Sequence, residues 1–85
     1  MNYQIIIEKA ALKSLSKLDK RLQTEISEAI DALAIEPRPF GYKKMVDANG
    51  LYRVKVKNYR IIYFVQDNLL IVTIVRVAKR NEQTY

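Results

Sequence analysis

The sequence contains no cysteine and no histidine, and these two absences exclude several kinds of chemistry. Without cysteine there is no disulfide framework, no thiol nucleophile and no thiolate ligand for a metal. Without histidine the chain lacks the commonest general base and a very common metal ligand. Zinc chemistry and Ser–His or Cys–His catalysis are therefore excluded, and we expect neither a metal nor another cofactor.

Long apolar runs are also missing. The longest run extends from Leu69 to Val75, is far shorter than a bilayer span and contains Thr73. The N-terminal apolar stretch is only residues 5–7, followed by Glu8 and Lys9, which is not the pattern of a signal peptide. We therefore expect a cytoplasmic protein without a membrane partner.

Acidic residues are scarce relative to basic ones. Fifteen Lys and Arg residues against nine Asp and Glu residues give a formal net charge of +6 and a pI near 9.7. Such a charge favours polyanionic partners, although a solubilising surface charge is the alternative. With 49% apolar and 28% charged residues, the chain has the composition of one folded domain, which we place at residues 1–85.

Hydrophobic periodicity in the first half predicts a strand followed by two helices. The strand is expected at residues 3–7, and the first helix from Lys9 to about residues 19–20. Asp19 is the expected N-cap of the second helix, which should end before Pro37. The apolar stripes are Ala11, Leu12, Leu15 and Leu18 in the first helix and Leu22, Ile26, Ala29, Ile30 and Leu33 in the second. Helices joined this closely predict an antiparallel hairpin covering one face of a sheet.

The second half predicts a three-stranded antiparallel meander, which makes the fold class α+β. A loop at residues 37–41 precedes strands at residues 51–56, 59–66 and 69–77, with tight turns at 57–58 and 67–68. Alternation divides the apolar residues between two faces, with Val54, Ile61, Tyr63, Val72 and Ile74 on one and Ile62, Phe64, Ile71 and Val75 on the other. The second face predicts either a groove for a partner segment or a sheet that curls on itself.

The hairpin around residues 57–58 concentrates positive charge on one side. A two-residue turn places Lys55 opposite Arg60 across the ladder, and alternation adds Arg53 to the same side. Cations held this closely on a rigid sheet cost Coulomb energy unless an anion binds between them. The pattern predicts an anion-binding surface, whereas each residue taken alone is also compatible with a solvated position on a sheet edge.

Five segments in a fixed order carry a resemblance to a known family: Glu8–Leu18, Pro37–Met45, Gly50–Lys55, Asn58–Tyr63 and Val75–Arg80. Together they resemble the RelE/ParE superfamily of toxins from type II toxin–antitoxin systems, across essentially the whole chain. The resemblance implies a RelE-like fold and, for the RelE-like branch, a ribosome-dependent endoribonuclease that cleaves messenger RNA. The alternatives are a ParE-like toxin that inhibits DNA gyrase, or an inactive relative that serves in antitoxin and operator binding.

The resemblance also implies a cationic and phenolic set at Arg53, Lys55, Arg60, Arg80 and Tyr85. Metal-independent cleavage proceeds by attack of a 2′-hydroxyl on the adjacent phosphate, and it needs a base, positive charge and an acid. Arg60 and Arg80 would stabilise the transition state, because fixed cations aimed at developing negative charge are usually the largest catalytic term. The candidate base is either a lysine whose neighbouring cations favour the neutral amine, for which Lys55 is best placed, or an exposed carboxylate. Tyr85 would stack on a base or take part in proton transfer.

Phosphate binding is assigned to the remaining cations near the hairpin. Arg53 stands where the type member of the family has a lysine, and arginine is a poor base, so we expect it to bind the substrate phosphate. Lys57, Lys43 and Lys44 are expected to do the same.

The expected partners follow from the charge and from the resemblance. A cognate antitoxin with an acidic, amphipathic segment would bury the apolar strip on the second sheet face and neutralise the cations. The ribosome with its messenger RNA is the expected substrate, and operator DNA would be bound only indirectly, through the antitoxin.

Overall fold

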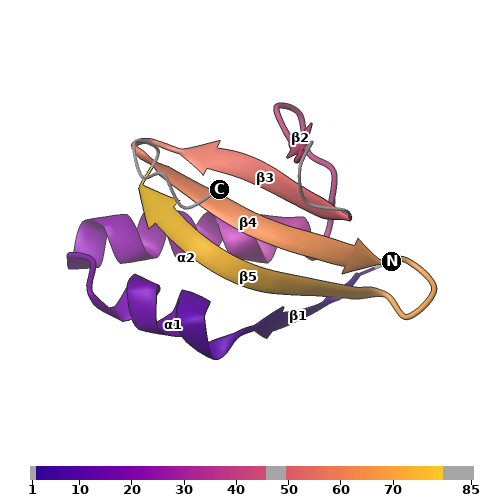
Figure 1. Ribbon diagram of the computed structural model, residues 1–85, viewed down its shortest axis with the longest axis horizontal. Coiled ribbons are helices and arrows are strands. Elements are labelled where there is room, and N and C mark those ends of the chain that lie inside the picture. The colour runs from indigo at the N-terminus through magenta and orange to yellow at the C-terminus, as the bar shows by residue number, and fades with distance from the viewer. Residues whose placement is uncertain (1, 46–49, 80–85) are drawn as a thin grey trace.

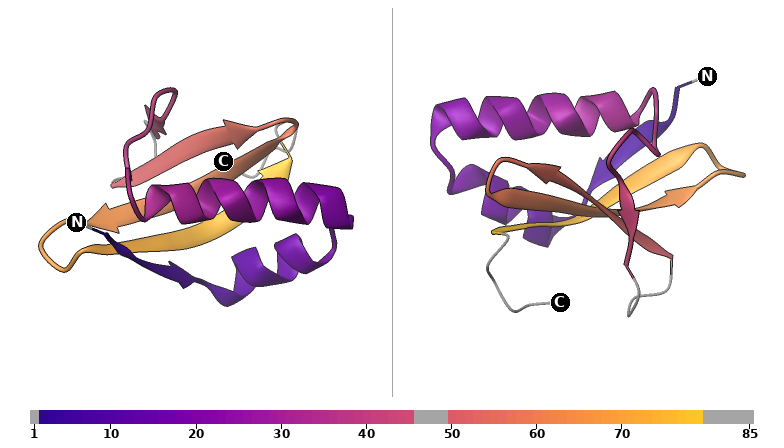
Figure 2. Two further views of the ribbon diagram at one scale, coloured as in Figure 1. Left: turned by 180° about the vertical axis from the view of Figure 1, so that it is seen from behind. Right: turned by 90° about the horizontal axis from the view of Figure 1, so that it is seen from above.

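The computed structural model describes residues 2–45 and 50–79, which form two layers. The elements in chain order are β1 (Gln4–Ile7), α1 (Lys9–Ser16), α2 (Lys20–Leu33), β2 (Lys43–Lys44), β3 (Leu51–Val56), β4 (Tyr59–Gln66) and β5 (Ile71–Lys79) (Figure 1). The strands form one sheet in the order β1-β5-β4-β3-β2, in which β1 runs parallel to β5 and the other pairs are antiparallel. Both helices lie on the same face of this sheet (Figure 2). The predicted α+β fold is confirmed.

The helical hairpin begins and ends close to where the sequence predicts. The carboxylate of Asp19 accepts a hydrogen bond from the N–H of Leu22 at 2.9 Å, which confirms Asp19 as the N-cap of α2. The first helix is shorter than predicted and ends at Ser16, because a tight turn at Lys17 and Leu18 leads directly into that cap. Neither described helix is long and apolar enough to cross a membrane.

The hydrophobic core fills the space between the helices and the sheet face that they cover, here called the inner face. It contains Ala11, Ile26, Ile30 and Leu33 from the helices and Ile61, Tyr63, Val72, Ile74 and Val77 from the sheet. Val54 packs against this cluster, so the predicted inner face is confirmed. Leu12, predicted to lie in the apolar stripe, is instead 54% exposed. It lies about 100° round the helix from Ala11, on the side away from the sheet.

The predicted strands need two corrections at the edges of the meander. The last strand begins at Ile71 rather than Leu69, because Leu69 and Leu70 belong to the β4–β5 turn, where Leu70 has a φ of 56°. No strand was predicted between the loop at residues 37–41 and residue 51, but Lys43 and Lys44 form the short edge strand β2. Two lysines carry no apolar alternation, so a strand there depends on pairing with β3, which the sequence pattern does not reveal.

A β-bulge in the β4–β5 pair changes which residues of β5 reach the core. Ile62 pairs with Arg76 whereas Tyr63 pairs with Ile74, so Val75 is an extra residue. Simple alternation from Ile74 would place Arg76 on the inner face. The bulge instead turns Val77 inward, where it is 4% exposed, and puts Arg76 on the face away from the helices, here called the outer face.

The core predicts a large difference between two leucine-to-alanine variants. Leu33 is 1% exposed, so Leu33→Ala should lower the free energy of unfolding by about 2–5 kcal/mol through lost burial and a residual cavity. Leu12→Ala, at an exposed position on α1, should change it by less than about 0.5 kcal/mol. Urea denaturation followed by circular dichroism measures both values, and equal losses would contradict this packing.

Candidate functional site

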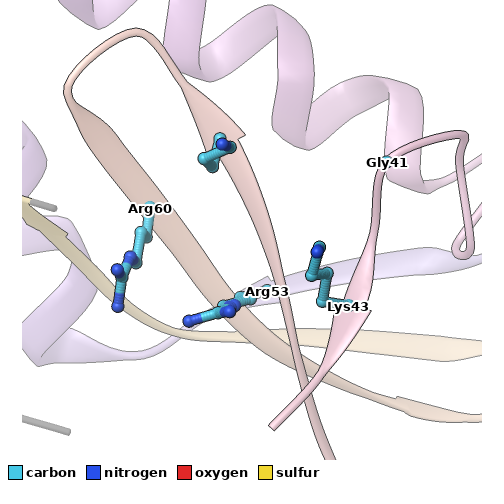
Figure 3. A pocket seen from close by; sticks show the side chains of 5 residues that line it. Gly41, Lys43, Arg53 and Arg60 are labelled. Carbon is cyan, nitrogen blue, oxygen red and sulfur yellow. The ribbon is translucent and has the colours of Figure 1, made fainter.

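Four cationic side chains from three neighbouring strands converge on the outer face. Lys43 of β2 lies directly opposite Arg53 of β3, and Lys55 of β3 lies directly opposite Arg60 of β4. Directly opposed residues have Cβ atoms about 4.5–5.5 Å apart. With Gly41 these side chains line a cavity of about 120 Å³, here called the cationic cavity. Figure 3 shows Lys43, Arg53 and Arg60 projecting from their strands around it.

The register of the β3–β4 hairpin places these cations. Val56 pairs with Tyr59, so residues 57–58 form a two-residue turn, as predicted. Lys57 has a φ of 55° there, in the left-handed region that two-residue hairpins favour at this position. The same register confirms the predicted opposition of Lys55 and Arg60. The cations are therefore held on regular, paired strands.

The electrostatics of the cavity favour an anion. The ion pairs among the described residues are Arg38–Asp67 and Lys57–Glu25, so within that part of the chain no carboxylate pairs with the cavity cations. Like charges directly opposite one another on a sheet are destabilising. Arg53 and Arg60 are half-buried, which favours a guanidinium fork that binds an oxyanion through two hydrogen bonds. Such a cavity can hold a phosphate group.

The other predicted site residues lie outside this cavity. The ammonium of Lys57 is 3.2 Å from the Glu25 carboxylate of α2. Lys44 lines a separate hollow of about 180 Å³ next to Tyr52. Arg80 and Tyr85 lie outside the described residues.

Two residues near the cavity were absent from the sequence prediction. Gly41 lines it with a φ of 92°, and a glycine following Pro37–Phe40 was interpreted only as a loop signal. Arg76 shares the outer face with Ile62, whose other ladder partner is Arg53. Because the bulge reverses the alternation of β5, no pattern in the sequence would have placed Arg76 there.

A metal centre has no support in the described part of the chain. Residues 2–45 and 50–79 contain no group of three or more His, Cys, Asp or Glu side chains close enough to share a metal ion.

An ion pair fastens the loop that leads into β2. The Arg38 guanidinium donates two hydrogen bonds to the Asp67 carboxylate, at 3.2 and 2.9 Å, and stacks 5.3 Å from the centre of the Tyr52 ring. The Tyr3 hydroxyl donates to the same carboxylate at 2.7 Å. The Arg38 bonds, with that of Tyr3, lower the pKa of Asp67 to about 2. The loop is thereby tied to the β4–β5 turn.

A buried tyrosine of β4 anchors the same loop from the core side. Tyr63 is fully buried, and its hydroxyl donates a hydrogen bond to the carbonyl oxygen of Pro37 at 2.7 Å. Burial raises the pKa of Tyr63 to about 12, so the hydroxyl remains a donor at neutral pH. Anchors at Pro37 and Arg38 fix the path of the chain toward Gly41 and Lys43. The cavity wall is therefore supported by contacts far from the cavity itself.

Comparison with known sequences gives a consistent result over nearly the whole chain. A family described as the ParE toxin of type II toxin–antitoxin system, parDE, matches residues 5–84. A protein of Escherichia coli named as a putative RelE-like toxin is 30% identical over an alignment of 82 residues, and the match covers 94% of this chain and 85% of that protein.

Solved structures share the same fold. The archaeal RelE–RelB complex from Pyrococcus horikoshii OT3 contains a chain with 30% identity and a TM-score of 0.83, with 96% of this chain and 99% of that chain covered. The RelBE2 toxin–antitoxin complex from Mycobacterium tuberculosis contains one with 25% identity and a TM-score of 0.83, with 96% and 95% covered. The similarity extends over the strands that carry the cationic cavity.

The ion pair between Arg38 and Asp67 predicts a specific dependence of stability on pH. The pKa of Asp67 is about 2 in the folded chain against an ordinary value of 3.8. The carboxylate therefore stabilises the fold fully above about pH 4, and this contribution is lost as the pH falls toward about 2. Wild type should exceed Asp67→Asn in the free energy of unfolding at neutral pH, and the difference should shrink over that acidic interval.

The measurement is a series of urea denaturation curves from neutral pH down to about pH 2. The matched control is Asp31→Asn, at an exposed position on α2, which should follow the wild-type curve. A difference between wild type and Asp67→Asn that stays constant over the whole range would contradict this role of Asp67.

Proposed function

We propose that this chain, which belongs to the ParE-toxin family of type II toxin–antitoxin systems and is RelE-like, cleaves messenger RNA on the ribosome and so inhibits translation in the cytoplasm. The observation that carries the proposal is the cationic cavity, in which two pairs of opposed cations have no ion-paired carboxylate among the described residues. A cavity lined by Lys and Arg side chains suits a phosphate group, and RNA carries one phosphate per nucleotide.

The proposed reaction is attack of a ribose 2′-hydroxyl on the adjacent phosphorus. The new P–O bond forms as the bond to the 5′-oxygen breaks, leaving a 2′,3′-cyclic phosphate and a free 5′-hydroxyl. The proton of the 2′-hydroxyl passes to a base, and another proton reaches the departing oxygen. No oxidant or metal is needed to balance this step.

The cavity residues divide these tasks by their chemistry. Arg53 and Lys43 bind the phosphate oxygens in the ground state. Arg60 adds fixed positive charge where the transition state gains negative charge. Lys55 is the proposed base, because its side chain lines the cavity directly opposite Arg60. Arg80 and Tyr85 lie outside the described residues. We propose that Arg80 joins Arg60 in stabilising the transition state and that Tyr85 stacks on a base or takes part in proton transfer.

The outer face also offers a surface for a cognate antitoxin. A groove of about 510 Å³ crosses β3, β4 and β5, and its lining is Glu8, Gly50, Leu51, Phe64, Val65 and Val75. We propose that an acidic, amphipathic segment of the antitoxin lies in this groove and extends its charged residues toward the cationic cavity. The similar chains from Pyrococcus horikoshii and Mycobacterium tuberculosis were solved in such complexes. Operator DNA would then be bound through the antitoxin.

Substitution of a cavity arginine tests the proposed reaction. Arg60→Gln should lower the rate of cleavage of ribosome-bound message about 100- to 1,000-fold, as expected when one preorganised transition-state donor is removed. Arg21→Gln, on the exposed surface of α2, is the matched control and should cleave like wild type. Primer extension on programmed ribosomes, in the presence and absence of EDTA, measures the cut. Intact message together with trapped DNA–gyrase complexes would contradict the proposal.

Substitution in the apolar groove tests the antitoxin surface separately. Phe64 lines the groove, so Phe64→Ala should weaken binding of the antitoxin encoded beside this gene by at least about tenfold. Leu69→Ala, an exposed apolar residue of the β4–β5 turn, is the control and should bind normally. Isothermal titration calorimetry measures both, with thermal melts to confirm folding. Equal affinities for Phe64→Ala and wild type would place the antitoxin elsewhere.

A further inference from the structure

Phe40 is a fully exposed aromatic residue beside the cationic cavity. Its exposed fraction is 106%, compared with 71% for Ile35 and 56% for Leu69. Gly41, the next residue, lines the cavity, so Phe40 directly precedes the cavity wall in the chain. None of the functions assigned above uses this ring.

The exposure of Phe40 is built into a fixed backbone. The N–H of Tyr42 donates to the carbonyl oxygen of Pro39 at 3.0 Å, which closes a four-residue turn with Phe40 at its corner. Gly41 has a φ of 92°, as the third position of a type II turn requires. The Tyr42 ring packs edge-on against Tyr52, with ring centres 5.6 Å apart. The turn is held before and after Phe40, and its corner presents the ring to solvent.

A cationic cavity next to an exposed ring is the arrangement that proteins use for single-stranded nucleic acid. Cations follow the phosphates, and an aromatic side chain stacks on a base. We propose that Phe40 stacks on a base of the RNA strand whose phosphate occupies the cationic cavity. The inference rests on the proposed function, because it needs RNA in that cavity. A stack on Phe40 would set the position of the strand relative to Arg53 and Arg60.

The surroundings of Phe40 favour a base over an apolar protein segment. The apolar groove proposed for the antitoxin is lined by other residues, from Glu8 to Val75, and does not include Phe40. Lys43, one of the cavity cations, lies three residues after Phe40 in the chain, so the ring is close in sequence to the proposed phosphate site. A fully exposed phenyl ring can stack on the flat face of a base.

A tryptophan at this position reports stacking directly. The chain contains no tryptophan, so Phe40→Trp introduces a single indole at an exposed position that leaves the core untouched. A short single-stranded RNA of mixed sequence should quench its fluorescence, because stacked bases quench indole. Inorganic polyphosphate, which supplies phosphates without bases, should bind without comparable quenching.

Affinity measurements separate stacking from charge. Phe40→Ala and Phe40→Leu should each weaken RNA binding about 5- to 150-fold, whereas Phe40→Trp retains it, and polyphosphate binding should not change. Ile35→Ala, an exposed apolar residue near the end of α2, is the matched control and should bind RNA like wild type. Fluorescence anisotropy with labelled RNA measures the affinities at constant salt.

The double variant Arg53→Gln/Arg60→Gln distinguishes failure of this inference from failure of the proposed function. Loss of both RNA and polyphosphate binding in the double variant, with unchanged RNA affinity in Phe40→Ala, overturns stacking and leaves the cationic cavity intact. Unchanged binding of both polymers in the double variant contradicts phosphate binding in the cationic cavity, and with it both the proposed function and this inference. A Phe40→Ala variant that binds RNA normally but loses antitoxin affinity assigns the ring to the protein partner and overturns the inference.

Discussion

The register of the β3–β4 hairpin is the constraint on which the rest of the structure depends. Side chains alternate along a strand, so a shift by one residue would exchange the two faces of β3. In the observed register Val54 and Val56 face the helices, while Arg53 and Lys55 face outward. The same register therefore both buries the valines and brings the cations together. Because the core forms without a bound anion, the packing of Val54 and Val56 is enough to keep the like charges close together.

Six cations on the β3–β4 hairpin, on β2 and in the loop before β2 fall into two groups with different roles. Arg38 and Lys57 each pair with a carboxylate, and these pairs tie the β2 loop to the β4–β5 turn and the β3–β4 turn to α2. Lys43, Arg53, Lys55 and Arg60 line the cavity and, within the described part of the chain, have no such pair. The exposed pair of Lys57 contributes little stability by itself. Its place at the end of the hairpin nevertheless links the strands that carry the cavity to the helical layer.

The sequence predicted the parts of this arrangement that depend on local patterns. Alternation of Val54 and Val56 with Arg53 and Lys55, followed by a two-residue turn, was enough for the hairpin register and its opposed cations. The remaining features depend on contacts distant in sequence. Lys43 joins the cavity only because β2 pairs with β3, and Arg76 reaches the outer face only through a bulge. Arg38 and Asp67 are 29 residues apart and gave no signal at all.

The loop before β2 shows how those distant contacts serve the candidate site. A proline- and glycine-containing loop on its own is the kind of segment that moves readily. Here the Pro37 carbonyl is bound to a buried tyrosine, and the Arg38 guanidinium is bound by two hydrogen bonds to a carboxylate of the far turn. Gly41 and Lys43 follow directly, so their positions at the cavity depend on an ion pair at the opposite end of β4. The same two anchors therefore hold the loop in place and fix the part of the cavity wall that Gly41 and Lys43 supply.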